Sequence, residues 1–357
     1  MPQKIENIDP NFRPQANTAE DGFCFRPLWE WENVVVDGLF PGTFCRIDPA
    51  ALPRIPSEGV RTLAWHTAGG TVRFRVPGGR FFVRMELRYG SDMSHMPRSG
   101  SGGLDVYCGS GFGRTFCAAL RPASNGPELV AGEIRLPAGE EEALLHLPLY
   151  DGVKNLELGF PEGVTPQPPT PYRVEEPVVF YGSSITQGGC ASRPGNAYPA
   201  MISRMLDCSF RNLGFSGNAK GEPETADYIA GLRMSAFVYD YDHNAPDVPW
   251  LARTHLPFLQ RILAAQPELP VVLVSKPDFH NGSPAVNNAC RDVILRSFLW
   301  ARENGYRAEF ADGAALFSGP LSGDCTVDGC HPNDLGFSRM AAGIAPALAR
   351  VMGLRRA

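Results

Sequence analysis

A stretch rich in proline divides this chain of 357 residues into two parts with different sequence patterns. Residues 161–177 contain six prolines, and proline is accommodated neither inside a helix nor in the inner strand of a sheet. A segment of this composition is expected to be extended and fairly stiff. The pattern therefore predicts a first domain over residues 1–165, a linker over residues 166–177 and a second domain over residues 178–357.

The first part consists of short apolar runs in which hydrophobic and polar residues alternate, broken by glycine and proline. Such alternation is typical of strands with one buried face, since neighbouring side chains point to opposite faces of a sheet. The pattern predicts an all-β sandwich, or jelly roll. Its clearest strands are expected at residues 71–76, 81–89, 114–120 and 143–150.

After the linker, short apolar strands alternate with longer helical stretches. Strands are expected at residues 177–181, 210–213, 236–241, 270–275 and 307–311, and helices at 196–206, 250–266, 286–304 and 335–352. Alternation of this kind predicts an α/β domain in which helices cover both faces of a parallel sheet. In such sheets, binding and catalytic sites form at the carboxyl ends of the strands.

Charge and hydropathy exclude several classes of function. The formal net charge is -5 and there is no basic run, so neither nucleic acid nor an anionic membrane is an expected partner. No apolar run approaches the length of a membrane span. Residues 1–9 lack the apolar core of a secretory signal, which favours a cytoplasmic location.

The nine cysteines are scattered through apolar segments, a distribution that favours buried, reduced thiols. Cys325 and Cys330 flank Asp328 and precede His331, so a metal site or a Cys325–Cys330 disulfide is the alternative there. No Cys-x-x-Cys pair occurs in the chain, and a zinc site is not expected without such spacing. The sequence thus predicts no metal ion and no cofactor.

Polar residues follow the expected strands of the second part. Ser184 lies just past the first strand, residues 214–218 past the second and residues 242–244 past the third, while Asp328 and His331 lie beyond the last. Each has a simpler explanation alone, because serine caps helices, glycine forms left-handed turns and asparagine bonds to its own backbone. Since the carboxyl ends of parallel strands share one edge, we expect these residues to converge.

The residue types at these positions suit nucleophilic attack by a serine. Ser184 needs a base to take its proton, His331 is an imidazole that can do so, and Asp328 can hold the ring in the required tautomer. A tetrahedral oxyanion needs donors already in place. We therefore predict Ser184, Asp328 and His331 as catalytic residues. The predicted oxyanion hole consists of the backbone N–H groups of Ser184 and Gly217 and the side-chain amide of Asn244.

Four ordered blocks resemble the SGNH, or GDSL-type, hydrolase superfamily: Gly182-Ser183-Ser184-Ile185-Thr186-Gln187-Gly188, Asn212-Leu213-Gly214-Phe215-Ser216-Gly217, Tyr241-Asp242-His243-Asn244 and Asp328-Gly329-Cys330-His331-Pro332. The resemblance implies a serine esterase with an SGNH-type (flavodoxin-like) three-layer α/β/α fold. Two positions depart from the family pattern. Ser183 replaces the aspartate that usually precedes the nucleophile, and Ala245 rather than aspartate follows Asn244.

The first domain carries a second resemblance. Gly103-Leu104-Asp105-Val106-Tyr107 is similar to the Gly-x-Asp-Leu-Tyr motif of a β-sandwich domain that precedes some SGNH esterases. This resemblance implies that Asp105 and Tyr107 reach the domain interface and form a wall of the cleft; the alternative is a strand with a capped turn. Aromatic residues near the amino terminus either form a sugar-stacking surface or pack in the sandwich: Phe23, Phe25, Trp29, Trp31 and Phe40.

These features predict a metal-independent serine esterase that forms an acyl-enzyme on Ser184. The two-domain resemblance to carbohydrate esterases implies a short acyl group, acetyl, on a sugar, so the expected partner is a small-molecule or oligosaccharide ester. A lipase or thioesterase acting on longer acyl chains is one alternative, and a non-catalytic carbohydrate-binding protein is another. The sugar, the position of the ester and the oligomeric state, a homo-oligomer included, stay open.

Overall fold

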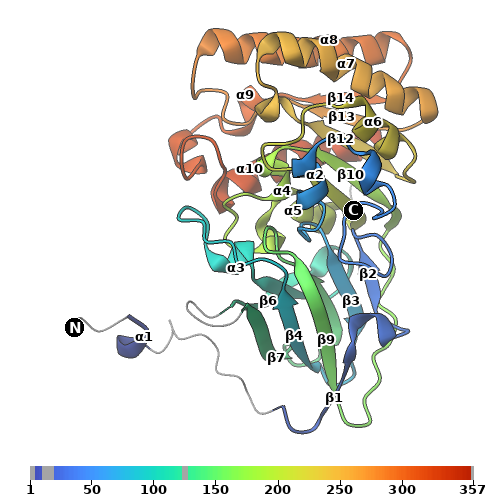
Figure 1. Ribbon diagram of the computed structural model, residues 1–357, viewed down its shortest axis with the longest axis vertical. Coiled ribbons are helices and arrows are strands. Elements are labelled where there is room, and N and C mark those ends of the chain that lie inside the picture. The colour runs from blue at the N-terminus through green and yellow to red at the C-terminus, as the bar shows by residue number, and fades with distance from the viewer. Residues whose placement is uncertain (1–4, 10–19, 123–127, 355–357) are drawn as a thin grey trace.

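The computed structural model describes residues 5–9, 20–122 and 128–354 and consists of an all-β domain followed by an α/β domain (Figure 1). Two antiparallel sheets make up the first domain, with strand orders β1-β9-β4-β7 and β2-β3-β8-β5-β6. The strands are β1 (Phe23–Pro27), β2 (Val35–Asp37), β3 (Thr71–Arg75), β4 (Arg80–Leu87), β5 (Leu104–Cys108), β6 (Thr115–Leu120), β7 (Leu129–Arg135), β8 (Glu142–His146) and β9 (Val153–Pro161).

Apolar side chains from both sheets form one buried cluster, which confirms the predicted sandwich. Phe74 of β3 packs edge-to-face on Phe160 of β9, with ring centroids 5.2 Å apart, and so joins one sheet to the other. Of the aromatic residues near the amino terminus, Phe23 and Trp31 are buried, whereas Trp29 is exposed. Helix α1 (Ile5–Ile8) precedes the first strand, and further short helical elements connect the strands: η2 (Leu28–Glu30), η3 (Leu52–Arg54), α2 (Glu58–Leu63), α3 (Arg98–Ser101) and η4 (Gly111–Gly113).

The second domain is built on a five-stranded parallel sheet of order β11-β10-β12-β13-β14, as the alternating pattern predicted. Its strands are β10 (Val174–Gly182), β11 (Cys208–Gly214), β12 (Ala236–Asp240), β13 (Val271–Val274) and β14 (Ala308–Ala311). The helical elements are α4 (Ser184–Gln187), η5 (Pro194–Asn196), α5 (Tyr198–Leu206), α6 (Pro223–Ala230), η6 (Asp242–Asn244), α7 (Val248–Ala265), α8 (Pro284–Glu303), α9 (Gly313–Leu316), η7 (Ser322–Cys325) and α10 (Asp334–Val351).

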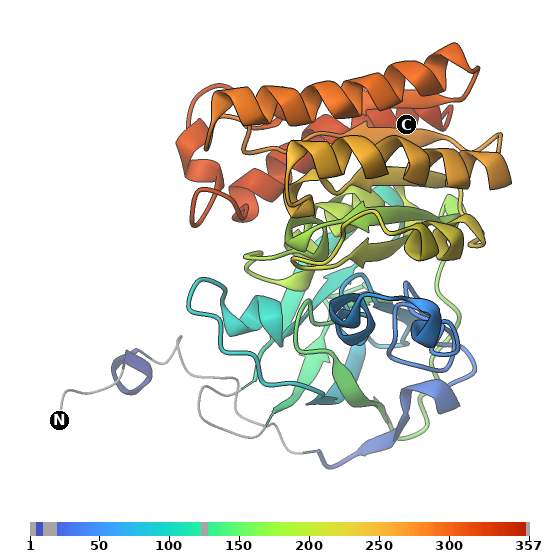
Figure 2. The same ribbon diagram turned by 45° about the horizontal axis from the view of Figure 1, so that its top comes forward.

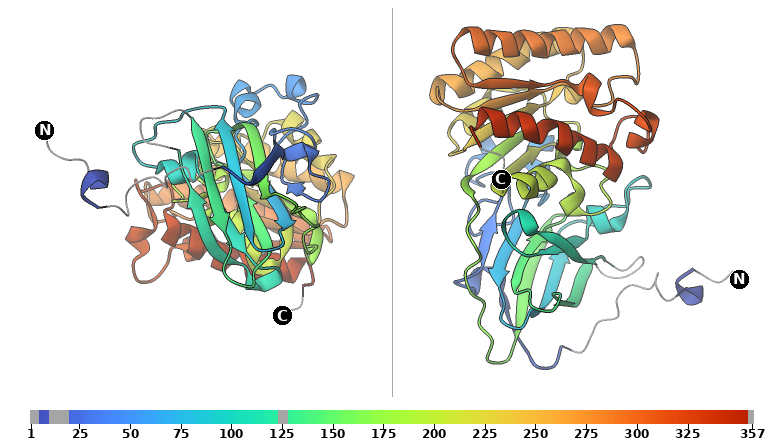
Figure 3. Two further views of the ribbon diagram at one scale, coloured as in Figure 1. Left: turned by 90° about the horizontal axis from the view of Figure 1, so that it is seen from below. Right: turned by 180° about the vertical axis from the view of Figure 1, so that it is seen from behind.

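Helices cover both faces of this sheet. Successive residues of a strand point to opposite faces, so one strand contributes side chains to both cores. On β10, Val178 and Phe180 join one core with α5 and α10, while Val179 and Tyr181 join a second core with α6, α7 and α8. The view from behind shows α10 lying across the first face (Figure 3, right). The three-layer α/β/α arrangement expected from the sequence is therefore confirmed. Among the described residues, no helix is long and apolar enough to cross a membrane.

The segment expected to be a linker lies along the sandwich. Gln167 forms an isolated bridge with Arg75, and Tyr172 stacks under the guanidinium of Arg73 at 3.8 Å from its ring centroid. Strand β10 begins at Val174, inside the range expected to be linker, with an irregularity in its pairing before Val178. Backbone pairing with β11 accounts for this earlier start, since Val174 pairs with Cys208.

Part of the first domain's sequence packs into the core of the second domain. Apolar residues between Cys45 and Ala64, including Ile47, Ile55 and Val60, belong to the same buried cluster as Leu213 of β11 and the residues of α6 and α7. Figure 2 shows this blue segment, which includes α2, directly beneath the α/β domain. The two domains consequently share a buried interface.

Candidate active site

Strand β10 and its turn determine where Ser184 lies. The strand ends at Gly182, where a Cβ atom would come within 2.1 Å of the carbonyl oxygen of Asp240, so only glycine fits there. Ser183 then caps helix α4, its hydroxyl oxygen accepting a hydrogen bond from the N–H of Ile185 at 3.1 Å. Ser183 thus caps the helix at the position where the family usually has an aspartate. Ser184 is the first residue of the helix and is 8% exposed.

Ser184, His331 and Asp328 form one continuous hydrogen-bonded chain. The Ser184 hydroxyl lies 2.9 Å from His331 Nε2, and His331 Nδ1 lies 2.8 Å from Asp328 Oδ2. The other oxygen of Asp328 accepts hydrogen bonds from the backbone N–H groups of His331 at 2.7 Å and Cys330 at 3.0 Å. A carboxylate with these bonds favours the tautomer with a proton on Nδ1, which leaves the Nε2 lone pair facing Ser184.

The charge of Asp328 is stabilised by the same contacts. Burial acts to raise the pKa of this carboxyl, but the hydrogen bonds from the His331 ring and from the backbone of His331 and Cys330 outweigh it and lower the pKa to about 2. Asp328 therefore stays ionised throughout the range in which esters are usually hydrolysed enzymatically. An ionised carboxylate at this position stabilises the imidazolium that forms when His331 accepts a proton.

Backbone hydrogen bonds fix both ends of the loop that carries His331. Val327 N–H donates to the His331 carbonyl oxygen at 2.9 Å, and Thr326 and Pro332 form an isolated bridge. Asn333 then caps α10, its side-chain oxygen accepting from the N–H groups of Leu335 and Gly336. Residues 331–333 thus lead directly into the last helix, and the ring of His331 is held by Asp328.

Three hydrogen-bond donors predicted for the oxyanion hole lack an acceptor within the described part of the chain: the N–H groups of Ser184 and Gly217 and Nδ2 of Asn244. Gly217 adopts φ +69°, and a Cβ at this position would meet no atom within 4 Å. Its conformation therefore requires glycine, while the space beside it does not. Asn244 Oδ1 accepts from Ala219 N–H at 3.3 Å, which orients the amide. Their catalytic role remains a prediction.

Asp105 and Tyr107 lie at the domain interface but not where a substrate could touch them. They are 0% and 5% exposed. Asp105 Oδ2 accepts from the Gly195 N–H at 2.9 Å and from Arg193 at 3.1 Å, and the same guanidinium donates to the Tyr107 hydroxyl at 2.7 Å. These two side chains therefore do not form the wall of the cleft that the sequence predicted. Burial directs both side chains to the segment before α5, which they hold in place.

Sequence reasoning missed a buried cation beside the segment that leads to Gly217. Arg46, in the segment that packs on the second domain, is fully buried and donates to the carbonyl oxygens of Asn212 at 2.9 Å, Gly214 at 2.7 Å and Leu63 at 2.7 Å. Burial lowers its pKa to about 9, so it remains charged near neutral pH. No local motif surrounds Arg46, and only the fold brings it to this loop.

Gln187 connects the helix that begins with Ser184 to the loop of Ser216 and to the first domain. Its Oε1 accepts from the Ser216 N–H at 3.0 Å, and its Nε2 donates to the Leu149 carbonyl oxygen at 3.0 Å and to His66 Nδ1 at 3.3 Å. Burial, followed by the charge of Arg46, lowers the pKa of His66 to about 3, which keeps its ring neutral and able to accept. In the sequence, the signal for this connecting role is that Gln187 follows Ser184 by only three residues.

A buried carboxyl forms hydrogen bonds with the turn that carries Ser184. Asp240, at the end of β12, accepts hydrogen bonds on Oδ2 from Thr186 at 3.2 Å and Tyr198 at 3.0 Å. Burial, followed by the nearby charge of Asp242, raises its pKa to about 7. This group therefore titrates near neutral pH although it lies outside the hydrogen-bonded chain of Ser184.

The cysteines around this loop are free thiols, and the alternative disulfide between Cys325 and Cys330 is not formed. Cys325 is buried and donates to the Leu321 carbonyl oxygen at 3.4 Å. Cys330 lies 3.8 Å from Nδ1 of His243. Among the described residues, Cys325 is in neither of the two groups of side chains that lie close enough together to hold a metal ion.

Comparisons with known proteins agree with this geometry. Residues 175–349 match the GDSL-like lipase/acylhydrolase family, and residues 32–165 match the family described as the N-terminus of SGNH-hydrolase-type esterases, the GxDLY domain. No curated protein matches the chain in sequence.

Solved structures match across both domains. A GDSL-like lipase from Bacteroides ovatus is 27% identical with a TM-score of 0.82, covering 93% of this chain and 99% of its own. A salicylyl-acyltransferase from a tetracycline biosynthetic pathway is 17% identical with a TM-score of 0.75, covering 93% and 98%. A family two carbohydrate esterase from Cellvibrio japonicus is 13% identical with a TM-score of 0.58, covering 93% and 98%. The chain is therefore a carboxylic-ester hydrolase whose α/β domain matches the GDSL-like lipase/acylhydrolase family and whose sandwich domain matches the GxDLY family.

Proposed function

We propose that this protein hydrolyses short-chain esters, with acetyl as the acyl group, on a carbohydrate, and that the reaction passes through an acyl-enzyme on Ser184. The observation that carries the chemistry is the continuous chain from the Ser184 hydroxyl through both nitrogens of His331 to Asp328. A nucleophile, a base and an orienting carboxylate in hydrogen-bond contact are the parts that acyl transfer to serine requires.

The geometry supports a two-step reaction. Ser184 Oγ attacks the ester carbonyl while its proton passes to His331 Nε2, and the N–H groups of Ser184 and Gly217 with the Asn244 amide bind the oxyanion. His331 then gives this proton to the departing sugar oxygen, which leaves an acyl group on Ser184. A water molecule, deprotonated by the same nitrogen, attacks the acyl-enzyme. The bond between the acyl group and Ser184 Oγ then breaks, His331 returns the proton to Oγ, and the acid is released.

The substrate class rests on relatives rather than on contacts. An acetyl xylan esterase from Butyrivibrio proteoclasticus covers its whole chain and 94% of this one, at 11% identity and a TM-score of 0.57. That likeness shows a shared two-domain fold, and it motivates the choice of an acetylated sugar as the first substrate to test.

The experiment is a substrate panel with the purified full chain. We expect turnover of nitrophenyl acetate to exceed that of nitrophenyl esters with long acyl chains, and acetate to be released from acetylated mono- and oligosaccharides. Ser184→Ala should lower kcat by about 10⁴–10⁶-fold, since the nucleophile acts as part of a unit. Ser183→Ala, which removes only the helix cap, is the matched control and should retain most activity.

Each contrary result has a definite meaning. A rate that increases with acyl length would replace the proposal with a lipase or thioesterase. Transfer of the acyl group to an added alcohol with little free acid would make the protein an acyltransferase. Failure of a fluorophosphonate probe to label Ser184 would favour a non-catalytic carbohydrate-binding protein.

A further inference from the structure

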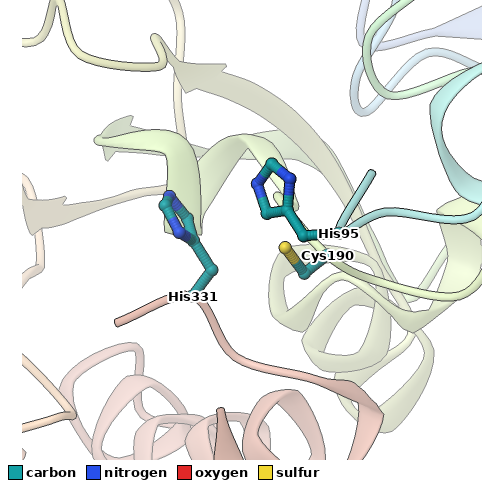
Figure 4. A group of neighbouring side chains, drawn as sticks. All are labelled: His95, Cys190 and His331. Atoms are coloured by element: carbon teal, nitrogen blue, oxygen red, sulfur yellow. The ribbon is translucent and has the colours of Figure 1, made fainter. Parts of the chain in front are cut away.

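Three potential metal ligands from separate segments meet beside the catalytic base. His95 comes from the loop before α3, Cys190 from the turn after α4, and His331 from the loop before α10. One ligand atom from each lies within 4.8 Å of the others. Figure 4 shows the two imidazole rings and the thiol directed toward a common space.

Neither of the two added side chains has a polar partner in the described part of the chain, although Cys190 also packs in the apolar core of the second domain. His95 forms no hydrogen bond or ion pair and makes only an edge-to-face contact with His331, with ring centroids 5.8 Å apart. Cys190 is a free, buried thiol at a backbone φ of 74°, and its sulfur has no hydrogen-bond partner. A non-glycine residue in this left-handed conformation is uncommon, and here it places the thiol beside the catalytic histidine.

The donor set suits zinc. Two imidazole nitrogens and a thiolate are ligands that Zn²⁺ binds tetrahedrally, with a fourth position open to water. Bond lengths of about 2.0–2.3 Å place neighbouring ligand atoms about 3.3–3.8 Å apart in such a site. His95 is exposed on its loop, and metal binding would require its ring to move closer to the other two ligands.

We propose that His95, Cys190 and His331 form an inhibitory Zn²⁺ site that switches the hydrolase off. His331 Nδ1 holds its proton toward Asp328, so Nε2 supplies the bond to the metal. That lone pair is the one that must accept the proton of Ser184, and metal binding removes it from catalysis. Burial, followed by the charge of Asp328, raises the pKa of the Cys190 thiol to about 12, so the thiolate forms only together with the metal bond. The S–H bond then breaks, a Zn–S bond forms, and the proton passes to solvent.

A second cluster nearby serves as the internal comparison. His243, Asp278 and Cys330 also offer ligand atoms within 4.8 Å of one another. In that cluster His243 Nε2 already lies 2.9 Å from Asp278 Oδ1, and both side chains are almost fully buried. A metal ion would have to break this ion pair, so we assign zinc to the His95 cluster and treat the other as a control.

The test measures zinc binding and inhibition separately on the full chain freed of metal. The variants are His95→Ala and Cys190→Ala, with His280→Ala, another exposed histidine, and Cys330→Ser as matched controls. Calorimetric titration with Zn²⁺ should give one site in the wild-type protein. Both ligand variants should bind more than about 100-fold more weakly, because even outer partners of metal ligands typically contribute about 10–100-fold. The two controls should bind like wild type.

Inhibition follows the same order. Zinc should abolish ester hydrolysis by the wild-type protein, and a chelator should restore it, whereas His95→Ala should resist the same zinc concentration relative to its own basal rate. Co²⁺ should give a thiolate charge-transfer absorption that Cys190→Ala lacks and Cys330→Ser keeps. Wild-type zinc affinity in both ligand variants, or its loss in Cys330→Ser, would overturn the proposal. The inhibitory role rests on the proposed function, but the titration and the cobalt spectrum test the site even if no ester is hydrolysed.

Discussion

Arg46 donates a hydrogen bond to the carbonyl oxygen of Gly214 at 2.7 Å, across 168 positions of sequence. Its guanidinium also lies 4.7 Å from the ring centroid of Phe215, so a buried charge supports the loop that leads to Gly217. This contact joins the first domain to the segment that leads to Gly217, and we infer that Arg46 positions that segment.

Replacing Arg46 by Met should lower kcat more than it changes KM. Loss of a single oxyanion donor costs about 10²–10³-fold, and a displaced donor should cost about 10–100-fold. Arg61→Met is the matched control, because Arg61 donates only to the carbonyl oxygens of Ile55 and Pro56 on the same segment. Arg46→Lys should recover part of the rate. Steady-state kinetics are measured below the unfolding temperature of each variant. An unchanged kcat together with a lower Tm would mean that Arg46 contributes only to stability.

Asp328→Asn should reduce kcat by about 10²–10⁴-fold with a small change in KM, because an amide no longer favours the proton on Nδ1 of His331. Asp324→Asn, an exposed aspartate on the same loop, should have no effect. Equal kcat values for the wild type and Asp328→Asn would mean that the pair is not coupled.

The pKa of Asp328 also has a consequence for the pH dependence. Its folded-state pKa of about 2 lies below the ordinary 3.8, so its contribution to folding is present above about pH 4 and is lost as the pH falls through 2. A pH–rate profile between pH 4 and 9 should therefore show no inflection from this carboxyl.

Asp240→Asn should stabilise the protein at high pH. Because the folded-state pKa is raised to about 7, the folded protein binds a proton more tightly than the unfolded chain, and stability falls as the pH rises from about 4 to 7. The difference between 3.8 and about 7 corresponds to at most about 4 kcal/mol. Thermal unfolding should show a higher Tm for Asp240→Asn at pH 8 and little difference at pH 4. A variant less stable than wild type at both would contradict this expectation.

Asp105→Asn should destabilise the protein with similar effects on large and small substrates. The substitution removes the charge that Arg193 faces at the buried interface, which should cost about 3 kcal/mol, whereas Tyr107→Phe removes one hydrogen bond worth about 1 kcal/mol. Urea unfolding measures both. Rates on nitrophenyl acetate and on an acetylated oligosaccharide should change by the same factor; a selective loss on the sugar would return these residues to the substrate wall.

Much of the fold was predictable because its signals are local. The apolar runs 177–181 and 270–275 and the helical stretch 335–352 correspond to β10, β13 and α10. The linker was less predictable: backbone pairing with Cys208 extends β10 back to Val174, and a sequence pattern does not contain that pairing partner.

The sequence alone decided the residue types at the ends of the strands, the glycine turns and the Asp-x-x-His spacing. Each of these depends on neighbours within a few positions. Only the tertiary structure decided that Ser184 meets His331, that Asp105 is buried against Arg193, and that Arg46 supports the loop of Gly214. These contacts depend on how sheets and helices pack. A buried charge such as Arg46 is stabilised by carbonyl oxygens that come together only once the two domains share their core.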